Sequence, residues 1–270
     1  MDVIDQADIQ GKSMCERNTD THPGDLISTT IEDRGIASDA VDNAVLDDLV
    51  VANHILFKHR VVDAFGHVSI RHPSNPERFL LSRNKAPAIV TAADIIEFHL
   101  DGTPVNARGR AVYLERFIHG EIYAERADVH AVIHSHASEV VPFGVSQQLL
   151  KPVWHMSGFL GLDTPVFEIR DVVGDSSDLL IRTRELGKAL AGSLGRHCVV
   201  LMRGHGATIV GDALKQCVFR AIYTQLNAEI QMNAMRLGDV TYLEPGEVEA
   251  TTRSVGSQID RAWNLWKSAT

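Results

Sequence analysis

The chain has 270 residues, of which 44% are hydrophobic and 23% charged, so it is long enough to bury the core of a large domain. This composition excludes a collagen-like, coiled-coil or wholly disordered protein. Acidic residues outnumber basic ones by 35 to 26, and the formal net charge is -9. We therefore expect no nucleic-acid partner, which would favour a basic face, and no membrane partner, since no apolar run approaches the roughly 20 residues that span a bilayer.

The expected compartment follows from the N-terminal residues and the cysteines. The stretch MDVIDQADIQGK has neither a basic start nor an apolar segment, so no secretory signal is expected. Cys15, Cys198 and Cys217 are too few and too scattered for a disulfide framework or a zinc ribbon. These observations predict a cytoplasmic protein. The unusual feature of the composition is its 13 histidines, several of which occur in close groups.

Residues 1–40 are polar and show little periodicity, which predicts a tail or an arm laid on a neighbouring subunit. A catalytic domain is expected over residues 41–250. In chain order, the spacing of apolar residues predicts a helix over 43–60, followed by strands at 66–73 and 78–82. Further strand structure is expected at 99–105 around a tight Asp101–Gly102 turn, then a helix over 115–126 and a buried strand at 131–136. A helix over 182–195 that ends at Gly195 precedes a strand, a turn and a second strand over 198–211.

A long helix is expected to follow, capped by Asp212, with apolar residues every four positions from Leu214 to Ile230. In the C-terminal segment 251–270, Trp263 and Trp266 are expected to pack on the core or on another subunit. Signals for hairpins outnumber signals for strand–helix–strand crossovers. This pattern favours a three-layer α/β/α domain with a mixed, mainly antiparallel central sheet over a dinucleotide-binding fold.

Three histidines have the spacing of a metal site. His134 and His136 are two residues apart on the predicted strand, so they share one face roughly 6.6 Å apart. They could converge on one cation, or be half-buried strand histidines. A catalytic centre needs a third ligand and keeps an open position. His205 is the best candidate, because glycines on both sides of it let a turn approach closely.

Several blocks, in this order, resemble the class II aldolase/adducin family: GHVSIR, HGEIY, ADVHAVIHSH, HMSGF and LMRGHGATIVG. The resemblance covers roughly residues 45–238. It implies a class II aldolase-like fold and a divalent metal held by His134, His136 and His205. It also implies a homotetramer with active sites at the subunit interfaces.

The chain departs from the aldolases of this family at positions that bear on the substrate. His67 follows Gly66 where those aldolases have Asn, and Leu81-Ser82-Arg83 replaces a phosphate loop. Tyr113-Leu114 replaces a pair of serines before the catalytic Glu of those aldolases, which remains here as Glu115. These changes remove donors that suit phosphate and add apolar surface. We therefore expect a flat, partly apolar acid as the substrate, which Arg83 could hold by its carboxylate unless it is only a solvated loop cation.

The blocks FLLSRNKAP, ERFIHGEIY and HMSGFLG are more similar to the decarboxylase branch of the family, which acts on substrates such as hydroxypyridine dicarboxylate or dihydroxyphthalate. The resemblance therefore predicts a metal-dependent decarboxylase of a hydroxylated aromatic or heteroaromatic carboxylate. Cleavage of the carbon–carbon bond would give an enolate that the divalent cation stabilises. Zn²⁺ suits three nitrogen ligands, whereas the resemblance indicates Mn²⁺, and both are retained.

The candidate proton donors are Glu115 and His155, since His155 stands where the aldolases often have a tyrosine acid. The candidate substrate-binding residues are His67, Ser69, Ser82, Arg83 and His119. His119, one helical turn after Glu115, could also orient Glu115 or form a simple helix pair with it. The alternatives are an aldolase acting on an unphosphorylated hydroxy-keto acid and a non-catalytic adducin-like assembly module. A sugar-phosphate dehydratase is disfavoured because the phosphate loop is missing.

Overall fold

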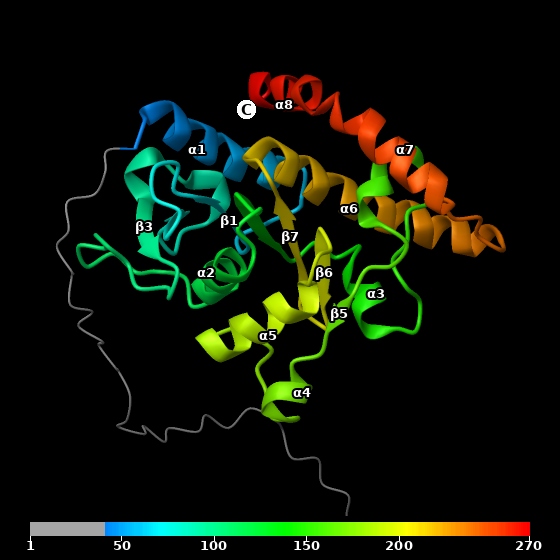
Figure 1. Cartoon of the computed structure of the whole chain (residues 1–270), viewed down its shortest axis with the longest axis horizontal. Coiled ribbons are helices and arrows are strands. Elements are labelled where there is room, and N and C mark those ends of the chain that lie inside the picture. The colour runs from blue at the N-terminus through cyan, green and yellow to red at the C-terminus, as the bar shows by residue number, and fades with distance from the viewer. Residues whose placement is uncertain (1–40) are drawn as a thin grey trace, which may run out of the picture. The chain divides into compact units, whose positions relative to one another are not determined.

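The computed structural model describes residues 41–270, and one seven-stranded sheet with helices on both faces forms their centre (Figure 1). The predicted tail or arm of residues 1–40 lies outside the described residues. The strands are β1 (His67–Arg71), β2 (Arg78–Ser82), β3 (Ile95–His99), β4 (Ala131–Ser135), β5 (Val166–Phe167), β6 (Val199–Met202) and β7 (Gly206–Gly211).

The strands follow the order β3-β2-β1-β4-β7-β6-β5 across the sheet. Every neighbouring pair is antiparallel except β5 and β6, which are parallel. The mixed, mainly antiparallel sheet predicted from the hairpin signals is therefore confirmed. It places β1, β4 and β7, which carry or adjoin the histidine motifs, next to one another.

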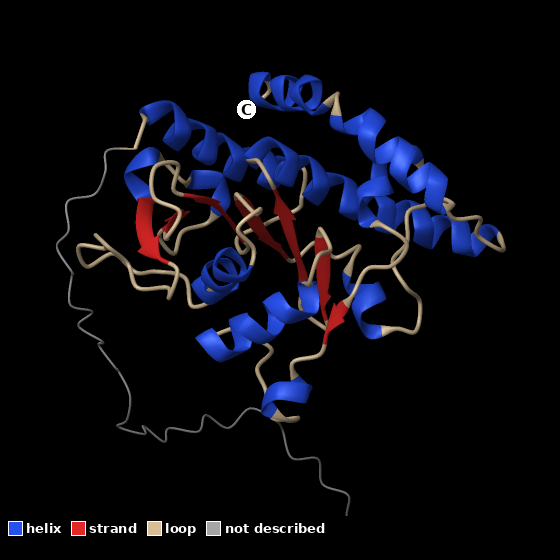
Figure 2. Ribbon diagram, in the orientation of Figure 1, coloured by secondary structure: helices blue, strands red, loops and turns tan. Residues whose placement is uncertain are grey.

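Helices form the outer layers (Figure 2). They are α1 (Asn43–Lys58), α2 (Arg116–Glu125), α3 (Val141–Val145), α4 (Arg170–Val173), α5 (Arg184–Leu194), α6 (Leu214–Leu237), α7 (Pro245–Gly256) and α8 (Ile259–Ser268), with short 3₁₀ helices η1 (Pro87–Ile89), η2 (Ala92–Asp94) and η3 (His155–Leu160). Buried side chains of α1, α6 and α8 fill a core on one face of the sheet, and those of α2 and α5 fill a second core on the other.

Alternation along the strands assigns each side chain to one of these cores. On β4, Ile133 packs in the core under α1 and α6, whereas Val132 packs in the core under α2 and α5. His134 lies two residues after Val132 and so faces the α2 and α5 layer. Trp263 of α8 is 2% exposed and packs in the α1 and α6 core, and packing of the segment 251–270 on a neighbouring subunit stays a prediction.

Two local predictions are wrong. The N-cap of α6 is Ala213 rather than Asp212, and the Asp212 N–H instead donates to the Gln216 side chain at 3.0 Å. The strand expected at 99–105 lies earlier, as β3, and beyond the Asp101–Gly102 turn only one bridge forms, between Phe98 and Pro104. Hydrogen bonds flank this bridge on both sides, from the His99 N–H to the Thr103 carbonyl and from the Val105 N–H to the Glu97 carbonyl. The domain boundary expected at residue 250, a position within α7, stays a prediction.

Candidate metal centre

The three histidines of the predicted metal site come from two neighbouring strand ends. His134 lies on β4, His136 immediately follows β4, and His205 lies in the turn between β6 and β7. In the pairing of β4 with β7, Ser135 lies opposite Ala207, which brings the turn against the end of β4. A Cβ atom at Gly206 would lie 2.0 Å from the Ser135 carbonyl oxygen, so only glycine permits this approach.

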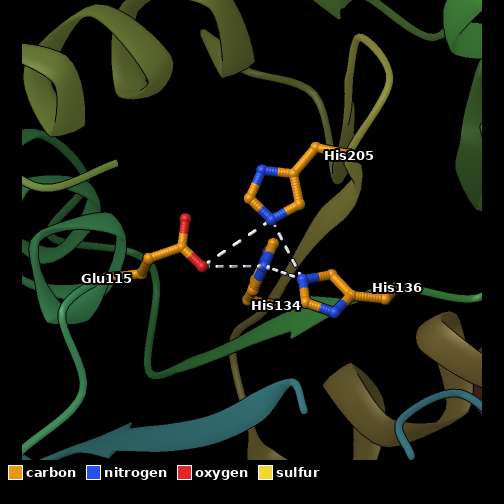
Figure 3. A group of neighbouring side chains, drawn as sticks. All are labelled: Glu115, His134, His136 and His205. Carbon is orange, nitrogen blue, oxygen red and sulfur yellow. Dashed lines mark hydrogen bonds and ion pairs between the residues drawn. The ribbon is translucent and has the colours of Figure 1, made fainter. Parts of the chain in front are cut away.

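The side chains of Glu115, His134, His136 and His205 converge on one point (Figure 3). The Nε2 atom of His136 lies 2.8 Å from Nε2 of His134 and 2.9 Å from Nε2 of His205. The Glu115 Oε2 atom lies 3.5 Å from Nε2 of His134 and 3.7 Å from Nε2 of His205. One ligand atom from each residue lies within 4.8 Å of the others, so the group could hold a metal ion.

Protons alone cannot satisfy this arrangement of nitrogens. His205 donates its Nδ1 proton to the Leu179 carbonyl at 2.8 Å, so a ring that carries a single proton presents a lone pair at Nε2. The single in-plane position at His136 Nε2 faces two other nitrogens and can hydrogen-bond to only one of them. A cation bound by all three lone pairs removes the conflict, so the residues present fit a divalent metal.

The ionisation of the cluster suits a metal site. Burial, and then the neighbouring His205, lower the pKa of His136 to about 4. The same causes hold the pKa of His134 well below its ordinary value. Both rings therefore stay neutral near pH 7, the form that binds metal. Burial raises the pKa of the Glu115 carboxyl, although the nearby His205 opposes this shift.

The loop before α5 supports two members of the cluster and was not found by sequence reasoning. The Ile181 N–H donates to Glu115 Oε1 at 2.9 Å, and the Leu179 carbonyl accepts from His205. Leu179 has a φ of 67°, a strained value for a branched side chain that adjacent structure must maintain. Because these contacts come from backbone atoms, no residue pattern in the loop indicates them. The His134 Nδ1 atom has no hydrogen-bond partner among residues 41–270.

A cavity of about 290 Å³ adjoins the cluster, with Glu115 and His136 in its wall. The other residues that line it are Ala64, Phe65, Gly66, His67, Asn84, Tyr113, Leu114 and Leu180. Its wall is mainly apolar and aromatic, with a few polar groups, which is typical of a site for a small organic ligand. Phe65, Asn84 and Leu180 were missed by sequence reasoning, since isolated loop residues carry no periodic signal.

The predicted substrate-binding residues differ in their positions. His67 lies in the cavity wall, whereas Ser69 and His119 are buried behind it and hydrogen-bond to each other at 2.6 Å. The structure does not bring Ser82 and Arg83 into the wall of this cavity. Ser82 is buried and donates to the Tyr113 hydroxyl at 3.4 Å, and Arg83 pairs with Asp94 at 2.7 Å. Their roles as substrate ligands stay predictions.

His155 is not brought together with the cluster. It lies at the start of η3, is exposed, and lines a separate cavity of about 400 Å³ formed with side chains of α6, α7 and α8. Among its neighbours there are Trp266, Tyr223 and Arg261. Within one chain, Glu115 is therefore the candidate proton donor that lies at the metal site, and the role of His155 stays a prediction.

A mixed sheet between helical layers, with three imidazoles and a carboxylate converging at the end of β4, defines a class II aldolase-like α/β protein. Residues 47–232 match the Class II Aldolase and Adducin N-terminal domain, and the chain belongs to this family. It is similar in fold to the L-fuculose 1-phosphate aldolase from Glaciozyma antarctica, with a TM-score of 0.70 and 21% identity over 87% of this chain and 94% of that one.

Curated relatives of this chain include proteins that are named as decarboxylases. Decarboxylase tropJ of Talaromyces stipitatus is 41% identical over 236 residues, which are 79% of this chain and 89% of that protein. The 3,4-dihydroxyphthalate decarboxylase of Arthrobacter keyseri is 27% identical over 200 residues, 70% of this chain and 78% of that protein. These relatives support the prediction of an enzyme, a carboxy-lyase. Among residues 41–270, no helix is both long and apolar enough to cross a membrane.

Proposed function

We propose that this protein is a metal-dependent decarboxylase of a hydroxylated aromatic or heteroaromatic carboxylate, including dicarboxylates. The observation that carries the proposal is the convergence of three imidazole nitrogens and the Glu115 carboxylate beside a mainly apolar cavity. The decarboxylase-named relatives support the same reaction class. The assignment of Mn²⁺ or Zn²⁺ and the cytoplasmic location stay predictions from the sequence.

The residues of the cluster divide the work of the reaction. His134, His136 and His205 would hold the cation, which supplies an electron sink when the carbon–carbon bond breaks. Glu115 is placed to return a proton to the substrate carbon, because the Ile181 N–H occupies Oε1 while Oε2 faces the cluster. In this role Glu115 would act as a general acid, which requires the bound substrate to lie within hydrogen-bonding reach of the carboxyl group.

The cavity wall accounts for the expected substrate class. Phe65, Tyr113 and Leu114 supply flat or apolar surface, and Asn84 and His67 supply polar groups. The His67 and Tyr113 rings lie 4.5 Å apart between centroids, which leaves an aromatic wall on one side. A planar hydroxy acid suits such a wall better than a sugar phosphate. Homotetrameric assembly with active sites at subunit interfaces belongs to this proposal, since within one chain His155 lies in a separate cavity.

The test begins with metal analysis of the purified protein, for which we expect a stoichiometric divalent cation. Protein loaded with Mn²⁺ or Zn²⁺ is then incubated with a panel of hydroxylated benzene and pyridine dicarboxylates, and both carbon dioxide and aldehyde are measured. We expect carbon dioxide to be released by the wild type and by His130→Ala, which replaces an exposed histidine outside the site, but not by His136→Ala. Release of an aldehyde would indicate the aldolase alternative, and absence of any bound cation would favour the assembly module.

A further inference from the structure

A buried chain of hydrogen bonds leads away from the cavity wall into the α2 core. The Nδ1 atom of His67 lies 2.6 Å from Nε2 of His119, and Nδ1 of His119 lies 2.6 Å from the Ser69 hydroxyl. The Ser69 hydroxyl in turn lies 2.8 Å from the Tyr123 hydroxyl. All four side chains are at most 3% exposed, and none of them is a member of the metal cluster.

This chain of hydrogen bonds forms because the spacing between the two side chains on the strand nearly equals the spacing between the two side chains on the helix. His67 and Ser69 are two residues apart on β1, which separates them by roughly 6.6 Å on one face. His119 and Tyr123 are four residues apart on α2, which separates them by about 6 Å along the helix. The two pairs therefore lie side by side and alternate along one continuous path.

The direction of the protons along this path follows from its buried end. Among residues 41–270, Ser69 is the one acceptor that hydrogen-bonds to the Tyr123 hydroxyl, since the Val132 backbone N–H beside it can only donate. If Tyr123 did not donate to Ser69, its buried O–H would be left without an acceptor, which costs free energy. Tyr123 therefore donates to Ser69, and the Ser69 proton is directed to Nδ1 of His119.

The same assignment of donors and acceptors extends to the imidazole rings of His119 and His67. Burial lowers the pKa of His119 to about 3, so this ring is neutral and carries one proton. Since its Nδ1 accepts from Ser69, that proton lies on Nε2 and is donated to Nδ1 of His67. Neutral His67 must then carry its own proton on Nε2, the ring nitrogen that has no partner among the described residues.

We propose that Tyr123, Ser69 and His119 are positioning residues that hold His67 in the Nε2–H tautomer, so that it presents a hydrogen-bond donor to the cavity beside the metal centre. His67 lines this cavity, and its ring centroid lies 5.1 Å from that of His134. The tautomer of His67 follows from the hydrogen bonds alone and does not depend on which reaction the protein catalyses. Its consequence for catalysis rests on the proposed function: the donor would bind an oxygen of the substrate, on which negative charge develops as carbon dioxide leaves.

The tautomer can be measured without any assay of activity. In the full-length protein labelled with ¹⁵N-histidine, with and without Zn²⁺, we expect the His67 signals to show a protonated Nε2 and an unprotonated Nδ1. His67→Gln assigns these signals. In Tyr123→Phe, either direction of the chain becomes allowed, so the His67 signals should move toward the average of the two tautomers. Tyr223→Phe is the matched control, since Tyr223 takes no part in this chain of hydrogen bonds and lies in the separate cavity beside His155. It should leave the His67 signals unchanged.

A kinetic comparison then tests the consequence. Once a substrate is identified, Tyr123→Phe should lower kcat about fivefold with a smaller effect on KM, the size expected for one misdirected hydrogen bond. If Tyr123→Phe fails to fold, Ser69→Ala and the wild-type spectrum still test the direction. A His67 proton found on Nδ1, or a tautomer unaffected by Tyr123→Phe, would overturn the proposal. Failure to release carbon dioxide with a correct tautomer would instead count against the proposed function alone.

Discussion

Acidification should destabilise this protein through His119, a residue that lies outside the metal cluster. His119 is fully buried between β1 and α2, and burial lowers its pKa to about 3. In the unfolded chain its pKa is that of an ordinary histidine, about 6.5. Below that pH the unfolded state binds a proton that the folded state does not. Stability is therefore complete above about pH 6.5 and falls as the pH decreases toward 3.

The magnitude follows from the two pKa values. At pH 5 the unfolded state gains about 2 kcal/mol from protonation of this one histidine, while folded His119 remains neutral. His67 and His134, whose pKa values burial also lowers, add losses of the same sign. His119→Gln removes one titrating ring but keeps groups that can donate and accept hydrogen bonds. Between pH 7 and pH 5, the variant should lose about 2 kcal/mol less than the wild type.

Urea unfolding, followed by tryptophan fluorescence in the presence of a chelator, measures this difference. The chelator removes the separate pH dependence of metal binding. Between pH 7.5 and 8.5 neither state takes up the proton, so the two free energies of unfolding should differ by a constant amount, which is the internal control. An equal loss of stability in both proteins on acidification, or a gain in the wild type, would refute the assignment of His119 as a buried neutral ring.

Three further outcomes are expected. Gly206→Ala places a Cβ atom 2.0 Å from the Ser135 carbonyl oxygen, so the free energy of unfolding measured with urea should fall by about 1–3 kcal/mol and Zn²⁺ binding should weaken. Gly246→Ala is the control, because a Cβ atom there meets nothing within 4 Å, and it should show neither effect. Zn²⁺ at about 100 times its Kd should stabilise the wild type by about 2.7 kcal/mol in thermal unfolding, and an equal shift in His136→Ala would contradict the ligand assignment. Trp263→Ala, at a side chain 2% exposed, should cost about 3–5 kcal/mol by denaturant titration, and a loss below 1 kcal/mol would argue against its place in the core.

The spacing of residues along the sequence identified those features of the site that form within one short segment of the chain. The two-residue spacing of His134 and His136 placed both at the end of one strand, and the glycines beside His205 predicted the tight turn that meets them. Hairpin signals predicted the mixed sheet. Each of these features depends on backbone geometry within a few residues, which the local sequence encodes directly.

Features that depend on contacts between layers were decided by the tertiary structure. Helical spacing left open whether His119 contacts Glu115 or the substrate, and the packing of α2 on the sheet turns His119 toward His67 and Ser69. The support that Leu179 and Ile181 give to the cluster comes from backbone atoms and has no residue signature. The spacing of residues in a helix or strand determines which of its side chains lie on the same face. Which residues of other elements those side chains contact depends on how the separate elements pack.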